Sequence, residues 1–168
     1  MQAQALGPTP LRINLGCGHT KLAGYEGVDI VDYGQRYIAD LQRLPFSDGA
    51  ADEVMAIHVI EHFYIWDIPD VLAEWHRVLA PGGKIVLEAP DLAKVIANIN
   101  AGEKNLLLTL MGLYGDIREK TAWHQHKWCW TPQAMARCLS ENGFKDAHEE
   151  PAQFHHPEAR DFRVVARV

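Results

Sequence analysis

The residues between 52 and 89 restrict the fold more than any other part of the chain. An apolar run, "DEVMAIHVI", is followed by "DIPDVLAEWHRVLAPGG" and then by a second apolar run, "GKIVLEA". The middle segment has apolar residues at helical spacing, namely Ile68, Val71, Leu72, Trp75, Val78 and Leu79. A strand, a helix and a strand in this order form a right-handed unit whose two strands are parallel. The sequence therefore predicts an α/β protein built on a parallel sheet.

The ends of this helix carry their own signals. Asp67 is expected to cap its N-terminus, with Pro69 in the first turn, and Gly82–Gly83 is expected to stop it before the next strand. Two further helical segments are expected after that strand. The first covers residues 92–100, with Asp91 as its N-terminal cap. Gly102 interrupts the helical pattern, and the second segment lies within residues 103–115. A last helix is predicted from the Thr131 cap to the Asn142–Gly143 stop.

Five more segments predict strands, and they complete a seven-stranded sheet. Three precede the central unit, at residues 11–15, 24–30 and 36–40, and two follow it, at 144–150 and 161–168. The connections between the first three strands are shorter than the dozen or so residues that a crossover helix needs. The sequence thus predicts a sheet whose first two crossovers are trimmed.

Composition limits the class of protein. At 168 residues the chain suggests a disordered lead-in over 1–10 and a single domain over 11–168. A net charge of -6 argues against contact with duplex nucleic acid, which needs a basic face. No apolar run reaches about 18 residues and the first residues lack the features of a secretory leader, so no membrane contact is expected. The scattered cysteines Cys17, Cys129 and Cys138 predict reduced thiols and a cytoplasmic location.

A glycine pair follows the first strand in "NLGCGHTK". Gly16 and Gly18 allow the backbone to approach a ligand closely at the end of a strand. Dinucleotide sites need a third glycine and a helix directly after it, but Lys21 stands at the third position and no helix follows. The pair on its own is equally compatible with a tight turn that binds nothing.

Two aspartates end the next two strands. Asp29 could accept hydrogen bonds from both ribose hydroxyls of a nucleoside, and Asp40 could accept from the amine of a purine. Each could instead be a solvated strand-end or turn residue. Because the carboxyl ends of parallel strands share one edge, the glycines and both aspartates are expected to meet there. The set favours a nucleoside ligand without a pyrophosphate.

The chain resembles the class I S-adenosylmethionine-dependent methyltransferases. The resemblance is carried by "INLGCG", "GVDIV", "DLQRLPFSDGAADEVMAIHVIEHF" and "VLAPGGKIVLEAPDL", and it is closest to the small group akin to the type 11 methyltransferase domain. It implies a Rossmann-like, mostly parallel seven-stranded sheet with an antiparallel last strand, and S-adenosyl-L-methionine as cofactor. It also implies methyl transfer, which requires the enzyme mainly to align and desolvate the reactants.

The resemblance further implies which residues contact the cofactor. The glycine loop would approach its methionine part, Asp29 its ribose and Ile30 its adenine. Asp40 and the backbone of Leu41 would read the adenine edge. The full implied set is Asn14, Gly16, Cys17, Gly18, Asp29, Ile30, Asp40, Leu41 and His58. Many relatives have an acidic residue where this chain has Asn14, so an acidic contact is not expected there.

Histidines and tryptophans supply the candidates for the acceptor side. His62 and His126 are predicted as catalytic bases or acceptor-orienting groups, and His124, Trp128 and Trp130 as substrate-binding residues. A structural role is open for each histidine, and core packing for the tryptophans, including Trp123. Trp66 and Trp75 are expected in the core. No metal is expected, although a set of His124, His126, His155 and His156 is conceivable.

The segment "WHQHKWCW", residues 123–130, is predicted to be a lid over the cleft, because nothing in the chain matches the N-terminal helical cap of many relatives. The function predicted is methyl transfer to a small-molecule or glycan-like acceptor. The alternatives are a non-catalytic S-adenosylmethionine-binding or interaction module and, more distantly, a dehydrogenase. A homo-oligomer or a partner that covers the site is left open.

Overall fold

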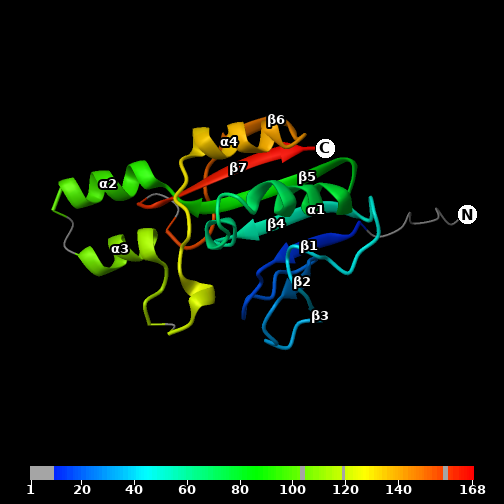
Figure 1. Cartoon of the computed structure of the whole chain (residues 1–168), viewed down its shortest axis with the longest axis horizontal. Coiled ribbons are helices and arrows are strands. Elements are labelled where there is room, and N and C mark those ends of the chain that lie inside the picture. The colour runs from blue at the N-terminus through cyan, green and yellow to red at the C-terminus, as the bar shows by residue number, and fades with distance from the viewer. Residues whose placement is uncertain (1–9, 103–104, 119, 157–158) are drawn as a thin grey trace, which may run out of the picture.

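A seven-stranded mixed sheet forms the centre of the protein (Figure 1). The computed structural model describes residues 10–168 except 103–104, 119 and 157–158, so the predicted lead-in over 1–10 lies almost entirely outside the described residues. The strands are β1 Arg12–Leu15, β2 Glu26–Asp29, β3 Tyr37–Ile38, β4 Ala51–Ile57, β5 Leu79–Pro90, β6 Lys145–Glu150 and β7 Asp161–Arg167. Their order is β3-β2-β1-β4-β5-β7-β6. The first five strands are parallel to one another, and β7 is antiparallel to β5 and β6, which confirms the predicted fold class.

Within the described part of the chain, four α-helices and two 3₁₀ turns connect the later strands. They are η1 Ile60–His62, α1 Ile68–Val78, α2 Leu92–Asn100, α3 Leu106–Tyr114, η2 Ala122–His124 and α4 Pro132–Glu141. The predicted caps at Asp91 and Thr131 are confirmed, since their side chains accept from the amides of Ala93 and Ala134. The predicted cap at Asp67 is wrong. Asp67 precedes α1 but has helical backbone angles, which do not aim its side chain at the first-turn amides, and it makes no capping hydrogen bond.

Most predicted strands are shorter by one to three residues in the structure, and two further boundary differences affect the position of the site. The helix ends at Val78, and Leu79, expected on its apolar face, opens β5 and pairs with Ala51. The strand β4 ends at Ile57 rather than at residue 60, because His58 has a φ of 54° and turns the chain out of the sheet. That turn places η1, with Glu61 and His62, at the carboxyl edge of the sheet.

The two faces of the sheet are covered unequally. Alternate residues of the central strands point to opposite faces. Val54, Ile85 and Val164 belong to the large core that includes Trp75 of α1, whereas Met55, Val86 and Val165 form a small separate cluster. Trp75 is fully buried as predicted, but the same prediction is wrong for Trp66, which is 70% exposed and stacks on Tyr64.

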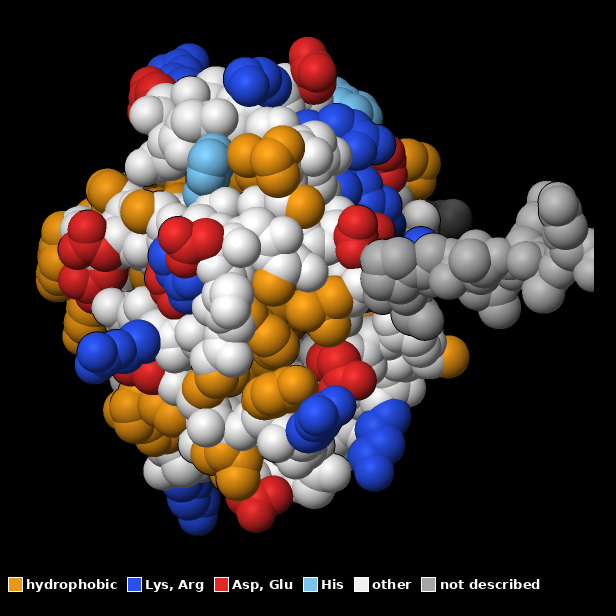
Figure 2. All heavy atoms as spheres, turned by 90° about the vertical axis from the view of Figure 1, so that its right-hand side faces the viewer, with side chains coloured by type: hydrophobic (Ala, Val, Ile, Leu, Met, Phe, Trp, Pro, Cys, Tyr) orange, Lys and Arg blue, Asp and Glu red, His pale blue; other side chains and the backbone are white. Residues whose placement is uncertain are grey.

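The described connections from β1 to β2 and from β2 to β3 contain no helix, as predicted. The small cluster is instead packed by the loop residues Leu22, Tyr25 and Phe154, together with Ile57 of β4. Figure 2 shows one side of the molecule, on which charged side chains of both signs are interspersed with hydrophobic ones. Among the described residues, no helix has the length and apolar character needed to cross a bilayer.

Candidate active site

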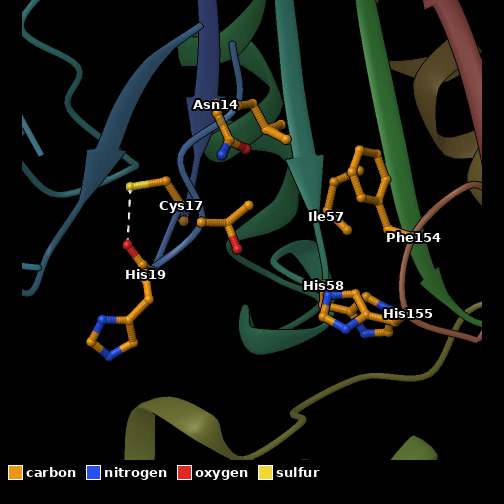
Figure 3. A pocket seen from close by; sticks show the side chains of 11 residues that line it. Asn14, Cys17, His19, Ile57, His58, Phe154 and His155 are labelled. Atoms are coloured by element: carbon orange, nitrogen blue, oxygen red, sulfur yellow. Dashed lines mark hydrogen bonds between the residues drawn. The ribbon is translucent and has the colours of Figure 1, made fainter.

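Two cavities meet at the carboxyl ends of the parallel strands. The larger one, here called the main cleft, has a volume of about 360 Å³ and extends from Asp29 and Asp40 to His62 and Lys127. The smaller one, the side pocket, has a volume of about 230 Å³ and lies between Asn14 and Phe154. Gly16, Gly18 and His58 line both cavities. Figure 3 shows the side pocket, with the sulfur of Cys17 directed away from Ile57 of β4 and with His58 beside His155.

The glycine loop connects the two cavities, and its conformation requires glycine. Gly16 and Gly18 have φ values of 60° and 50°, in the left-handed region. A Cβ on Gly16 would also lie 2.5 Å from a methyl carbon of Val59. The amide of Cys17 donates to the carbonyl of Val28, which holds the loop against β2. Burial, with the nearby charge of Asp29, raises the pKa of the Cys17 thiol, so the thiol stays protonated.

Asp29 holds the loop and faces the main cleft. Its Oδ2 accepts from the amide of Gly18 at 2.9 Å, and its Oδ1 accepts from the amide of Val31 at 3.1 Å. A carboxylate oxygen has two acceptor sites, so both oxygens keep one for a ligand. Asp40 uses Oδ1 to accept from the amide of Gln42. The carbonyl of Leu41 accepts from the indole of Trp75, which ties this corner of the cleft to α1.

A buried charged group lies beneath the cleft. His58 lies between two carboxylates, with Nε2 3.0 Å from Asp161 Oδ2 and Nδ1 3.3 Å from Glu61 Oε1. Burial alone would lower the pKa of His58, but the two carboxylates outweigh it and raise that pKa to about 9. Burial would likewise raise the pKa of Glu61, yet the neighbouring imidazoles, His58 first, lower it to about 2. His58 is therefore an imidazolium at neutral pH, and both carboxylates are ionised.

Sequence reasoning missed Glu61 and Asp161. Glu61 lies inside "HVIEHF", between His58 and His62, which were both predicted as site residues. Its position between them was the one feature of the sequence that could have indicated a role in the site. Asp161 lies at the start of β7, where the antiparallel pairing with β5 brings it to the same edge. No sequence spacing indicates that contact.

His62 and His126 come together, but they line different cavities. Their rings are in edge-to-face contact, with 4.9 Å between centroids. His62 lines the main cleft. His126 instead lines a third cavity, the outer cavity, of about 630 Å³, together with Tyr114, Thr121 and Gln125. Burial lowers the pKa of both histidines. The structure thus brings the two rings into contact but places His126 at the outer cavity rather than at the main cleft.

The segment 123–130, predicted to be a lid, is anchored on η1. The amides of Lys127 and Trp128 both donate to the carbonyl of Glu61, at 2.8 and 3.2 Å. The ammonium of Lys127 donates to the carbonyl of His62. Trp123, His124 and Lys127 line the main cleft.

The tryptophans of this segment differ in position. Trp130 packs in the large core and is 3% exposed, so its predicted contact with a substrate is wrong. Trp128 is on the surface and, within the described structure, is not part of the lining of the main cleft. Trp123, for which core packing was the competing expectation, is exposed at the cleft. A run of alternating aromatic residues has no period that indicates which ring points inward.

The set of His124, His126, His155 and His156, considered as conceivable metal ligands beside the expectation of no metal, is not assembled. His126 contacts His62, whereas His155 contacts His58. A different group converges instead. One possible ligand atom from each of Glu61, His62 and His126 lies within 4.8 Å of the others.

Comparison with known proteins agrees with this geometry. Residues 22–87 match the model of a family described as "Methyltransferase domain". The chain contains a methyltransferase domain. A stretch of 54 residues is also 39% identical to the "Uncharacterized 37.1 kDa protein in transposon TN4556" of Streptomyces fradiae, and it covers 32% of this chain and 15% of that protein.

Solved structures share the fold of this methyltransferase domain over almost its whole length. A SAM-dependent methyltransferase from Archaeoglobus fulgidus has a TM-score of 0.65 at 16% identity, covering 96% of this chain and 87% of that one. The 1,6-didemethyltoxoflavin-N1-methyltransferase of Burkholderia thailandensis, solved with bound 1,6-didemethyltoxoflavin and S-adenosylhomocysteine, has a TM-score of 0.64 at 14% identity, covering 94% and 71%. A putative methyltransferase of Haloferax volcanii, solved in complex with the Trm112 methyltransferase activator, has a TM-score of 0.62 at 14% identity, covering 95% and 82%.

These findings confirm the predicted family, fold and enzyme class of the methyltransferase domain, and S-adenosylmethionine as the cofactor of that class. The family match begins at Leu22, after the glycine loop. Every residue predicted to contact the cofactor lines the main cleft, the side pocket or both. Asn14 and Cys17 line the side pocket, Gly16, Gly18 and His58 line both, and Asp29, Ile30, Asp40 and Leu41 line the main cleft.

Proposed function

We propose that the protein transfers the methyl group of S-adenosylmethionine to a small-molecule or glycan-like acceptor. One observation carries the proposal. The glycine loop, Asp29 and Asp40 line the same cleft as His62, Trp123 and His124. Groups suited to a nucleoside and groups suited to a polar or planar acceptor thus share one cleft at the carboxyl edge of a parallel sheet, the usual ligand position in such folds.

In this proposal the cofactor lies across both cavities. Its ribose hydroxyls donate to Asp29, while its adenine packs against Ile30 and is read by Asp40 and the backbone of Leu41. Its methionine part follows the glycine loop towards the side pocket, near Asn14, Cys17 and His58. The acidic Asp29–Asp40 end suits the hydroxyl and amine donors of a nucleoside, because a charge-assisted hydrogen bond is worth roughly 1.5–3 kcal/mol.

The acceptor then occupies the end of the cleft at His62, His124 and Trp123. A lone pair of the acceptor attacks the methyl carbon, and the carbon–sulfur bond breaks with its electron pair moving to sulfur, which yields S-adenosylhomocysteine. An acceptor hydroxyl or ammonium must also lose a proton. Of the two histidines predicted for that step, His62 is the one that reaches the cleft.

Calorimetry with S-adenosylhomocysteine and with NAD tests the cofactor assignment. S-adenosylhomocysteine should bind, and the Asp29→Ala variant should bind it more weakly. Asp32→Ala, which changes an exposed residue in the connection between β2 and β3, should not differ from the parent chain. Tighter binding of NAD than of S-adenosylhomocysteine would contradict the proposal. Formation of S-adenosylhomocysteine from S-adenosylmethionine with candidate acceptors tests catalysis.

A non-catalytic cofactor-binding module is the second candidate, and Asn14 favours it. Asn14 is 4% exposed and lines the side pocket, where an acidic residue is expected from the resemblance. Cofactor binding without turnover over a broad panel of acceptors would support this alternative.

We further propose a cytoplasmic location, which the three free cysteines support. Segment 123–130 is proposed to close over bound ligand, in which case S-adenosylhomocysteine should slow its proteolysis. A homo-oligomer or a partner protein could complete the covering of the cleft, and chromatography with light scattering would detect a homo-oligomer.

A further inference from the structure

Three side chains between the main cleft and the outer cavity have the composition of a metal site. Glu61 and His62 belong to η1, and His126 lies in the segment that is anchored on the carbonyl of Glu61. One ligand atom from each lies within 4.8 Å of the others, and His126 Nε2 is 3.8 Å from Glu61 Oε1. Among the described residues this is the one such group of three or more histidine, cysteine or acidic side chains.

Glu61 is the most informative of the three residues, because its carboxylate is buried with an ion-pair contact to His58 but with an incomplete set of hydrogen bonds. Its side chain is 2% exposed, and neither carboxylate oxygen has a hydrogen bond of acceptable geometry within the described structure. His58 makes an ion-pair contact with Oε1 at 3.3 Å, but the same ring is bonded through Nε2 to Asp161. Buried carboxylate oxygens are normally satisfied by donors or by a cation. A cation is the partner that the surrounding side chains could hold.

Both imidazoles are oriented as metal-binding histidines usually are. Nδ1 of His62 lies 3.2 Å from the carbonyl oxygen of Gln125, and Nδ1 of His126 lies 3.1 Å from that of Gly112. A carbonyl oxygen only accepts, so each Nδ1 carries the proton and donates. Nε2 of each ring therefore has a free lone pair. Metal-ligating histidines almost always donate their other ring N–H to a carbonyl or carboxylate in this way.

We propose that Glu61, His62 and His126 bind one divalent transition-metal ion, with Zn²⁺ as the reference ion. Two imidazoles and one carboxylate suit Zn²⁺, Co²⁺ or Fe²⁺, whereas Mg²⁺ prefers oxygen ligands. Binding draws the three atoms towards the roughly 3.4 Å separation that tetrahedral ligands about 2.1 Å from Zn²⁺ require. This proposal departs from the sequence-based expectation that no metal binds.

The proposed ion would have a role in the proposed methyl transfer. That catalytic role rests on the proposed function, whereas metal binding itself is independent of it. Three protein ligands leave at least one open position, the pattern of catalytic rather than structural zinc. His62 places the ion at the wall of the main cleft. An acceptor hydroxyl bound at the open position would lose its proton to solvent more readily, and the resulting oxygen would attack the methyl carbon. With the ion bound, His62 is a ligand rather than the base.

Titration of the chelator-stripped protein with Co²⁺ and Zn²⁺ tests the site directly. We expect one Co²⁺ ion to bind per chain and to give the visible absorption of a four- or five-coordinate site. Zn²⁺ should displace the bound Co²⁺, and Mg²⁺ should not. Glu61→Gln and His126→Asn should each weaken binding by at least about 10-fold, since loss of an outer-shell partner already costs 10- to 100-fold. His148→Ala, which removes an exposed histidine on β6, is the matched control and should bind as the parent chain does.

Two outcomes would overturn the site: no stoichiometric binding by the parent chain, or unchanged binding by both the Glu61→Gln and His126→Asn variants. Circular dichroism checks that each variant is folded. If a variant fails to fold, the parent chain alone decides the question, because Zn²⁺ but not Mg²⁺ should raise its melting temperature.

Acetohydroxamate, a bidentate oxygen ligand, tests the open position. It should shift the Co²⁺ spectrum of the parent chain in a saturable manner, and an unchanged spectrum would overturn the acceptor-binding role. S-adenosylhomocysteine binding to the stripped protein separates the two proposals. Cofactor binding without metal binding refutes the metal site alone, whereas metal binding without cofactor binding refutes the proposed function alone.

Discussion

The amide of Gly18 donates to Oδ2 of Asp29 at 2.9 Å, so one carboxylate both shapes the glycine loop and faces the main cleft. Asp29 is therefore part of the fold as well as of the candidate site. The alternative of a solvated strand-end residue does not hold for Asp29, because this side chain is almost fully buried and accepts from two amides.

Asp29→Ala should weaken S-adenosylhomocysteine binding by about 2–4 kcal/mol, the value of two charge-assisted hydrogen bonds to the ribose. It should also lower the free energy of unfolding by about 1–3 kcal/mol, because two loop amides lose their acceptor. Calorimetry and urea unfolding measure the two effects on one preparation. An unchanged dissociation constant would show that Asp29 only supports the loop.

Gly16→Ala should destabilise the loop for two separable reasons. Its φ of 60° disfavours any side chain, and the new Cβ would lie 2.5 Å from a methyl carbon of Val59. We expect a loss of about 1–3 kcal/mol in unfolding free energy. Gly24→Ala is the control, because Gly24 also has a positive φ of 81° but a Cβ there would have no atom within 4 Å.

Denaturant unfolding compares these two variants. The added Val59→Ala change should recover part of the loss in Gly16→Ala, since it removes the contact but not the backbone strain. If Gly16→Ala and Gly24→Ala cost the same, the contact with Val59 has no energetic weight.

Trp130→Ala and Trp123→Ala should behave oppositely, although both residues belong to one aromatic run. Trp130 is in the core, so its truncation should cost about 3–5 kcal/mol of unfolding free energy. Trp123 is 60% exposed at the cleft, so its truncation should change stability by no more than about 0.5 kcal/mol. Chemical denaturation followed by circular dichroism gives both values. Equal losses would mean that Trp123 also packs in the core.

Glu74 should make stability depend on pH through its contacts with Arg77. The hydrogen bond from Arg77 lowers the pKa of Glu74 below its usual value of 4.5. A carboxyl whose folded pKa is depressed contributes stability above its unfolded pKa and loses it as the pH falls through the folded one. Glu74→Gln should therefore be less stable than the parent chain at pH 7, and the difference should shrink below about pH 4.

Urea unfolding at both pH values measures this difference. The control is Asp70→Asn, which changes an exposed carboxylate on the same helix. A difference for Glu74→Gln that is independent of pH would indicate lost packing rather than lost charge.

The sequence predicted well those features that depend on local pattern and on strand order. Apolar runs predicted the strands, Asp91 and Thr131 indicated where two helices begin, and the parallel strand order predicted that Asp29 and Asp40 lie at one edge of the sheet. Two kinds of feature could not be predicted from the sequence. Contacts between distant segments, such as His58 with Asp161, depend on how β7 pairs with β5. The direction of each ring in residues 123–130 depends on backbone hydrogen bonds to Glu61, which leave no periodic trace.

The missing crossover helices have a thermodynamic consequence. The β2–β3 edge ends in a strand of two residues, and loops cover the sheet face where those helices would lie. A nucleoside seated against Ile30, Asp40 and Leu41 would contact the carboxyl end of this short edge and so act as a structural element of it. Ligand uptake and ordering of the edge would then be one event, with affinity and local stability rising together. Backbone amides of residues 26–41 would exchange with solvent more slowly in the liganded protein than in the free one.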